Sequence, residues 1–167
     1  MKKFFITALL ACSISAFAAE TLFRLPMEEA ELTKIAFRKN FVIQDVNGTK
    51  CLYLKKPRNV VEVRLPEELA QFDGEFVRIT YRYRLKDVPK PEKPHLGFKV
   101  MAVYKYANGK THHGHAASPH GTTDWKWEGY NLQIKKDAKD FKLAFILPAA
   151  GEVWISNITV TYQNKGK

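Results

Sequence analysis

Four consecutive runs near the C-terminus decide the fold: Gly121-Thr-Thr-Asp-Trp-Lys-Trp127, Gly129-Tyr-Asn-Leu-Gln-Ile134, Phe141-Lys-Leu-Ala-Phe-Ile-Leu147 and Gly151-Glu-Val-Trp-Ile-Ser-Asn-Ile-Thr-Val-Thr-Tyr162. In the last three runs apolar residues alternate with polar ones, which is the period of a half-buried strand. Turn residues separate the runs. The pattern predicts three strands at the end of the chain, with a turn before the first of them.

The same alternation appears earlier in the chain. From Phe76 to Leu85 every second residue is apolar, and Gly97 to Tyr106 repeats the pattern before an Asn108-Gly109 turn. Helical signals are weak and confined to Pro26–Phe37 and one turn at Pro66–Leu69. Many short strands and little helix predict an all-β protein, a single jelly-roll β-sandwich of two antiparallel sheets. Shorter strands are expected at Phe41–Ile43, Lys50–Lys55 and Val60–Leu65, and a proline-stiffened loop at Val88–His95.

The first 18 residues have the pattern of a signal peptide. Lys2 and Lys3 precede a short apolar run, and Ala16-Phe17-Ala18 supplies a cleavage pattern of small residues. We therefore expect an extracytoplasmic domain, periplasmic or secreted, that spans residues 19–167. The alternative is a lipoprotein, because Leu9-Leu10-Ala11-Cys12 resembles a lipobox. No other run has the roughly 20 apolar residues that a transmembrane helix needs.

The chain is strongly basic. It has 27 Lys and Arg against 17 Asp and Glu, and its pI is about 9.6. Such a charge favours acidic partners: uronic or sulfated polysaccharide, lipopolysaccharide phosphate or nucleic acid. The export signal argues against nucleic acid. The alternative is that the basic surface only keeps the protein soluble. Cys51 is the one cysteine left after cleavage, and we expect it to be a small core residue.

The order of the strands resembles that of the jelly-roll carbohydrate-binding modules, galactose-binding-domain-like, of bacterial extracytoplasmic proteins. In that family a Gly-Thr-x-Asp-Trp turn opens one strand, as at Gly121, and a Gly-x-Val-Trp-Phe-Asp-Asp-Val-like strand ends the domain, as at Gly151. The runs that begin at Asn47, Phe72 and Gly97 also resemble strands of these modules. The resemblance covers roughly residues 47–162 and implies a polysaccharide-binding β-sandwich.

One part of the family pattern is missing. Such modules often hold a structural calcium between an N-terminal Asn-Gly-Asp-Phe-Glu segment and an Asp of the last strand. Here Ser156-Asn157 stands where Asp-Asp is expected, and no Gly-Asp-Phe-Glu occurs near the N-terminus. Calcium needs several carboxylate or carbonyl oxygens. We therefore predict no calcium site and no other metal or cofactor.

Trp127 is the first candidate for ligand binding. Alternation sends Tyr130, Leu132 and Ile134 to the core, so Trp127, Asn131 and Gln133 should face outward. An exposed indole stacks on the apolar faces of sugar rings, and amides hydrogen-bond their hydroxyls. The alternative is that Trp127 packs beneath a loop. Trp125 is expected to be a packing anchor and Trp154 a core residue.

A row of arginines is the second candidate. Arg78, Arg82 and Arg84 point away from the core in the predicted strand, and Lys99 and Lys105 lie on a neighbouring run. Guanidinium groups on one strand face can bind carboxylates or sulfates through paired hydrogen bonds. The sequence does not say whether the two runs share a sheet. The alternative is a solvated face.

Histidines supply the third candidate. His112, His113 and His115 occur together in a predicted loop, and His120 follows. Such a loop can bind zinc or copper, contact sugar in a pH-dependent way, or only add polarity to the surface. Nothing in the sequence fixes a metal geometry.

Catalysis finds little support in the sequence, because no nucleophile elbow, zinc-protease motif, phosphate loop or CxxC pair is present. The leading hypothesis is therefore non-catalytic polysaccharide binding by an exported module, with acidic glycans favoured by the charge. The runner-up is a structural or interaction module of the cell envelope that has lost sugar binding. A small hydrolase or lyase is a third reading.

Overall fold

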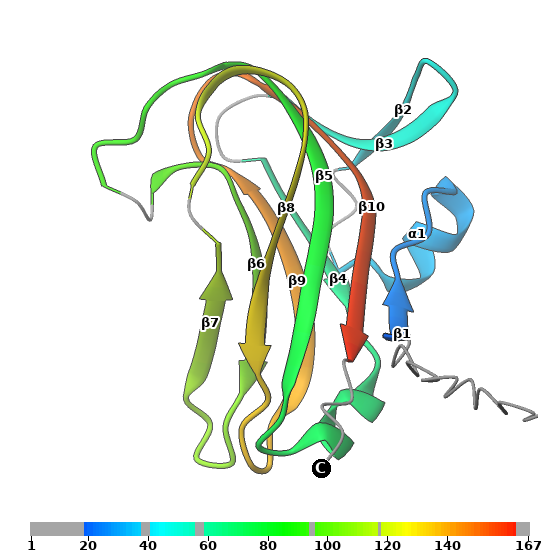
Figure 1. Cartoon of the computed structure of the whole chain (residues 1–167), viewed down its shortest axis with the longest axis vertical. Coiled ribbons are helices and arrows are strands. Elements are labelled where there is room, and N and C mark those ends of the chain that lie inside the picture. Colours follow the sequence, from blue (N-terminus) through cyan, green and yellow to red (C-terminus); the bar gives the residue numbers. More distant parts are fainter. Residues whose placement is uncertain (1–18, 38–40, 56–58, 94–95, 117, 163–167) are drawn as a thin grey trace, which may run out of the picture.

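A computed structural model describes residues 19–37, 41–55, 59–93, 96–116 and 118–162 (Figure 1). The predicted signal peptide and Cys12 lie outside the described residues. In the described part of the chain no helix is long and apolar enough to cross a membrane. The elements are β1 (Glu20–Arg24), α1 (Glu29–Ile35), β2 (Val42–Val46), β3 (Thr49–Lys55), β4 (Asn59–Arg64), the 3-10 helix η1 (Glu67–Phe72), β5 (Phe76–Val88), β6 (Lys99–Lys105), β7 (Thr111–His115), β8 (Gly121–Gln133), β9 (Lys139–Leu147) and β10 (Glu152–Tyr162).

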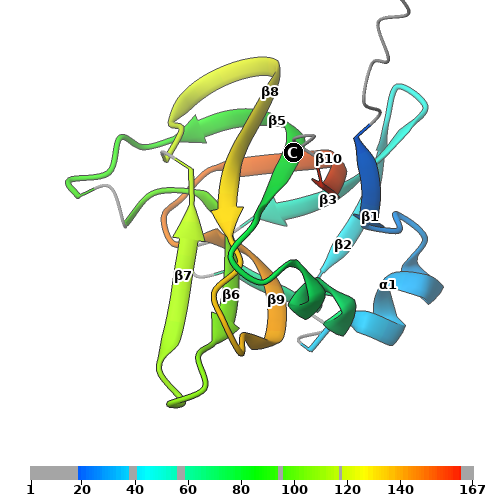
Figure 2. The ribbon, with the colours of Figure 1, turned by 60° about the horizontal axis from the view of Figure 1, so that its bottom comes forward.

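The strands form two antiparallel sheets, as the sequence predicts. Sheet A has the order β2-β3-β10-β5-β8, and β1 pairs with the second half of β10 on the edge that β3 leaves open. Sheet B has the order β4-β9-β6-β7. Strands distant in sequence therefore lie side by side, and the two sheets face each other (Figure 2). The architecture is an all-β sandwich.

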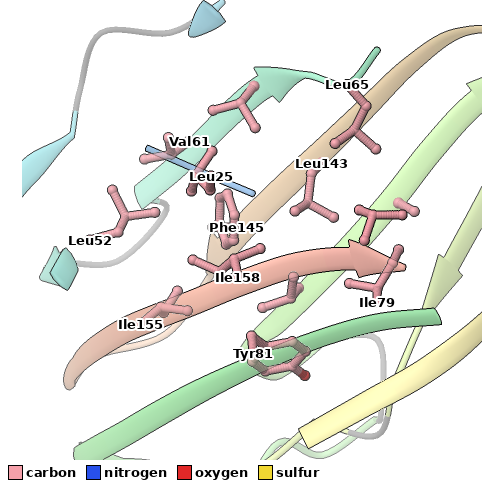
Figure 3. Packing of buried hydrophobic residues seen from close by; sticks show 14 of the residues in the cluster. Leu25, Leu52, Val61, Leu65, Ile79, Tyr81, Leu143, Phe145, Ile155 and Ile158 are labelled. Carbon is pink, nitrogen blue, oxygen red and sulfur yellow. The ribbon is translucent and has the colours of Figure 1, made fainter. Parts of the chain in front are cut away.

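The core lies between the sheets and follows from the period of two. In β5 the side chains of Val77, Ile79, Tyr81, Tyr83 and Leu85 are buried, while the residues between them face outward. Side chains from β9 and β10, among them Phe145 and Ile155, pack against this row (Figure 3). A strand that buries one face exposes the other, and this fixes which side chains of sheet A are available to a ligand.

The two helical segments, α1 with 7 residues and η1 with 6, are short and lie against sheet B. The weak helical pattern of Pro26–Phe37 becomes α1, which buries Leu32. Ala36 then forms a bridge with Val63 of β4. This bridge carries Phe37 over the outer surface of sheet B, where its ring is 43% exposed.

Two predictions about strands are wrong. The histidine segment is not a loop but strand β7, which pairs with β6 at the edge of sheet B. The Gly121-Thr-Thr-Asp-Trp segment is not a turn, because β8 already begins at Gly121 and pairs with β5 from Val88 onward. Polar segments form strands here because a neighbouring strand completes their backbone hydrogen bonds.

Candidate functional site

The outward side chains of β8, β5 and β10 meet on one surface, which we call the sheet-A face. Strand register places Arg82 between Trp127 of β8 and Ser156 of β10, and it places Arg78 opposite Asn131. The structure therefore gathers Trp127, Asn131, Gln133, Arg78, Arg82 and Arg84 on a single face, as the alternation predicts.

Trp127 projects from this face into solvent. Its side chain is 64% exposed, more than any other large hydrophobic side chain among the described residues. Trp125 lies two residues earlier on the same strand and is half-buried. The guanidinium carbon of Arg82 lies 4.9 Å from the centre of the Trp125 ring, a cation–π contact that holds the arginine in place. Two indoles and one ordered cation therefore lie within one short segment of the face.

A second aromatic group lies farther along the face, around Trp154. Its ring packs at 5.2 Å from the ring of Tyr53, and the guanidinium carbon of Arg84 lies 5.6 Å from its centre. Its Nε1 donates a hydrogen bond of 2.9 Å to Oε1 of Gln44. The prediction that Trp154 is a core residue is wrong: Val153 and Ile155 point inward, so Trp154 points outward and is half-buried by its neighbours.

Glu152, the first residue of β10, lies at this end of the face. Its carboxylate accepts a short hydrogen bond from the Tyr53 hydroxyl and lies 3.3 Å from Lys86 Nζ. The Tyr53 hydrogen bond is the largest cause that lowers the pKa of Glu152; burial opposes it, and Lys86 and Lys55 lower the pKa further. Burial and then the contact with Glu152 raise the pKa of Tyr53 to about 12. Glu152 is therefore a paired carboxylate that fixes the surrounding side chains.

Small side chains lie in the middle of the face. The hydroxyls of Thr80 and Thr159 are hydrogen-bonded at 2.7 Å, and Gly129 lies opposite Thr80. A Cβ atom at Gly129 would come within 2.8 Å of the Ile79 carbonyl oxygen. Only glycine fits this close approach without a shift, and the position therefore carries no side chain between Trp127 and Asn131.

Polar groups mark the far end of the face. Arg78 Nη1 donates to Asn131 Oδ1 at 3.2 Å, which orients both side chains. Gln133 lies at the end of β8, where its Nε2 donates to the carbonyl of Gly74 at 3.3 Å and its Oε1 accepts from Lys135. Arg78 and Asn131 are thus paired with each other, and Asn131 is exposed, whereas both polar atoms of Gln133 are bonded to other residues.

The other predicted candidates lie elsewhere. Lys99 and Lys105 belong to β6 and therefore to sheet B, whereas the arginines of β5 belong to sheet A. The sequence alone does not decide whether these two strands share a sheet. The histidines of β7 also belong to sheet B. His112 is half-buried, stacks on Tyr104 at 4.6 Å between ring centres and hydrogen-bonds Tyr106 through Nδ1. His113, His115 and His120 are exposed.

No group of three or more His, Cys, Asp or Glu residues in the described part of the chain is arranged to hold a metal ion. Ser156 is buried, and Asn157, with φ of 51°, forms part of a bulge in β10. Cys51 is fully buried, as predicted, and burial raises the pKa of its thiol to about 11.

No protein-family model and no curated protein matches the chain. Comparison of structures does find similar folds. The C-terminal family 22 carbohydrate-binding module of Clostridium thermocellum Xyn10B superimposes with a TM-score of 0.62 at 11% identity, over 88% of this chain and 96% of that one.

Two further solved structures have a similar fold over most of this chain. The CBM22-1 xylan-binding domain of Paenibacillus barcinonensis Xyn10C has a TM-score of 0.60 at 14% identity, over 91% of this chain and 100% of that one. A xylan-binding domain of CBM 22 has a TM-score of 0.60 at 10% identity, over 89% and 98% of the two chains. At such identities the likeness shows the fold, which is the jelly-roll sandwich of carbohydrate-binding modules.

Proposed function

We propose that the protein binds polysaccharide without catalysis and that the sheet-A face holds the ligand. The observation that carries the proposal is the indole of Trp127, which is 64% exposed beside Arg82 and Trp125. Stacking of this ring on the apolar face of a sugar removes both surfaces from water and stabilises the complex. The neighbouring polar groups orient the sugar hydroxyls. The fold shared with xylan-binding modules supports the same function.

The charge of the face favours an acidic polysaccharide such as a uronate or a sulfated glycan. Arg82 and Arg84 each stack on an indole, and neither forms an ion pair with a carboxylate of the described residues. Their N–H groups are thus held in position for an incoming carboxylate or sulfate. A neutral glycan would contact the Trp127 indole and Asn131 but would offer no anionic group to Arg82 and Arg84.

The place of action follows from the predicted signal peptide. We infer that cleavage after Ala18 yields an exported protein, so that the ligand is an extracytoplasmic polysaccharide. Mass spectrometry of the protein recovered from the cell envelope tests this step. A mature chain that begins at Ala19 supports it, whereas a lipid-modified Cys12 would place the domain on a membrane surface instead.

A glycan array read at low and high salt tests the function. Binding to uronate or sulfated glycans that weakens with salt supports the acidic ligand, and binding that is insensitive to salt supports a neutral one. An array with no bound glycan at either salt concentration would instead favour the structural or interaction module of the cell envelope.

A further inference from the structure

A basic pocket lies on the other side of the molecule, at the outer surface of sheet B. It has a volume of about 260 Å³. Residues of β4, β6 and β9 line it together with Phe37, which follows α1, and Glu67 of η1. The charged side chains at its wall are Arg64, Lys105, Lys142, Asp140 and Glu67.

Strand register places like charges opposite each other here. Arg64 of β4 pairs with Lys142 of β9, and Lys105 of β6 pairs with Lys139 of β9. Like charges directly opposite in an antiparallel pair are destabilising. Two such pairs in neighbouring rows concentrate positive charge at one end of β9.

One of these cations is neutralised and two are not. Lys105 Nζ lies 2.7 Å from Asp140 Oδ2. By contrast, neither Arg64 nor Lys142 forms an ion pair with any carboxylate of the described residues. The pocket therefore holds two cations with no carboxylate of the described residues at ion-pair distance, although Glu67 lines the same pocket.

The ring of Phe37 orders these two cations. The Arg64 guanidinium carbon lies 5.1 Å from the centre of the ring, and Lys142 Nζ lies 4.4 Å from it. Both cations are thus gathered on one aromatic side chain, although they repel each other. A cation–π contact holds a cation without using all of its hydrogen-bond donors, so these donors can still meet an oxyanion.

The positive charge around the pocket stabilises the ionised carboxylate of Asp140. The hydrogen bond and charge of Lys105 lower the pKa of its carboxyl, and the charges of Lys139 and Lys142 lower it further. A second oxyanion in the pocket would experience the same cations.

We propose that this pocket binds a sulfate or carboxylate group carried by an acidic polysaccharide, with Arg64 and Lys142 as its ligands. The choice of a glycan as the carrier rests on the proposed function, but the site is separate from the sheet-A face and contains none of its residues. An oxyanion bound there removes the repulsion between the paired cations, and Arg64 provides a planar fork for two of its oxygens.

Three polymers with one backbone test the site: dextran, carboxymethyl-dextran and dextran sulfate, titrated calorimetrically at low ionic strength. The test variant is Arg64→Gln/Lys142→Gln. The control is Lys90→Gln/Lys93→Gln, which removes the same charge from the exposed loop before β6. Melting curves of both variants establish that they are folded, and the substituted side chains lie at the surface, where such changes cost little stability.

We expect one or both charged polymers to bind the wild type and dextran to bind much more weakly. The test variant should lose about tenfold or more in affinity, because it loses two charge-assisted contacts, while the control changes little. An equal loss in the two variants would show non-specific attraction by net charge and overturn the proposal. So would the absence of binding by both charged polymers.

Titration of Trp127→Ala with the same polymers separates this proposal from the proposed function. If only Arg64→Gln/Lys142→Gln weakens binding, the pocket exists and the sheet-A face has failed as a glycan site. If only Trp127→Ala weakens binding, the sheet-A face stands and the pocket is refuted.

Discussion

Arg82 stacks on Trp125, with its guanidinium carbon 4.9 Å from the centre of the indole. The contact joins β5 to β8 across the face that carries Trp127. Trp125 is half-buried and is not among the side chains packed against the core, whereas Trp127 is the exposed indole. A cation ordered in this way loses less conformational entropy when a ligand binds.

Two replacements of Arg82 should distinguish the contribution of its charge to binding from that of its planar guanidinium group. We expect Arg82→Ala to weaken binding of a uronate or sulfated glycan mainly at low salt, because ionic contacts are screened over about 10 Å at 0.1 M. Arg82→Lys should restore only part of the affinity, since lysine lacks the planar fork. Calorimetric titration at two salt concentrations measures both effects. A loss of affinity that is the same at both would contradict an ionic role.

Gly151 should be intolerant of a side chain. Its φ is 112°, and a Cβ there would lie 2.9 Å from the Asp87 carbonyl oxygen and from Val88 Cα. We expect Gly151→Ala to lower the free energy of unfolding by about 2 kcal/mol, from strain and backbone displacement together. Gly109→Ala is the control, because φ is also positive there but the space is open. Equal losses in urea denaturation would contradict the crowding at Gly151.

His112 should make stability fall in mild acid. Burial, followed by the charges of His113 and Lys135, lowers its pKa below the usual value of 6.5. Its folded pKa is therefore below the unfolded one, so its contribution is complete above about pH 6.5 and is lost as the pH falls through the folded value. The melting temperature of the wild type should fall as the pH drops below about 6.5. His112→Gln should show a smaller drop, and an unchanged drop would exclude His112 as its source.

Calcium should not stabilise the protein. Ser156 and Asn157 are neutral, Ser156 is buried, and the described residues contain no metal-binding group of three or more side chains. We expect melting curves recorded with calcium and with chelator to superimpose. A ligand at 100 times its dissociation constant would stabilise by about 2.7 kcal/mol, so a clear rise in melting temperature with calcium would contradict this prediction.

The sequence predicts the strands whose alternation is strong. In β5 and β9 every second side chain is apolar, and these side chains form the core. The same alternation correctly places Trp127 and the arginines on the outside. This succeeds because one buried sheet face fixes the direction of every side chain in a strand.

Other features depend on contacts that a single sequence does not contain. Strand β7 consists of threonine, glycine and histidines, and its pairing with β6 defines it. The sheet to which Lys99 belongs depends on topology. The pocket beside Phe37 depends on the bridge between Ala36 and Val63, which joins segments distant in the chain. The alternation of β10 turns Val153 and Ile155 inward and Trp154 outward, although a tryptophan in a closing strand is expected in the core.

The central claim is tested most directly with a polysaccharide that binds on the glycan array. This polysaccharide is titrated into the wild type, Trp127→Ala and Leu96→Ala. Leu96 is the control, because it is also exposed but belongs to the loop before β6 and not to a strand of sheet A. We expect Trp127→Ala to lose at least tenfold in affinity with a nearly unchanged melting temperature, and Leu96→Ala to bind like the wild type. If Trp127→Ala remains folded and binds as tightly as the wild type, the sheet-A face is not the polysaccharide site.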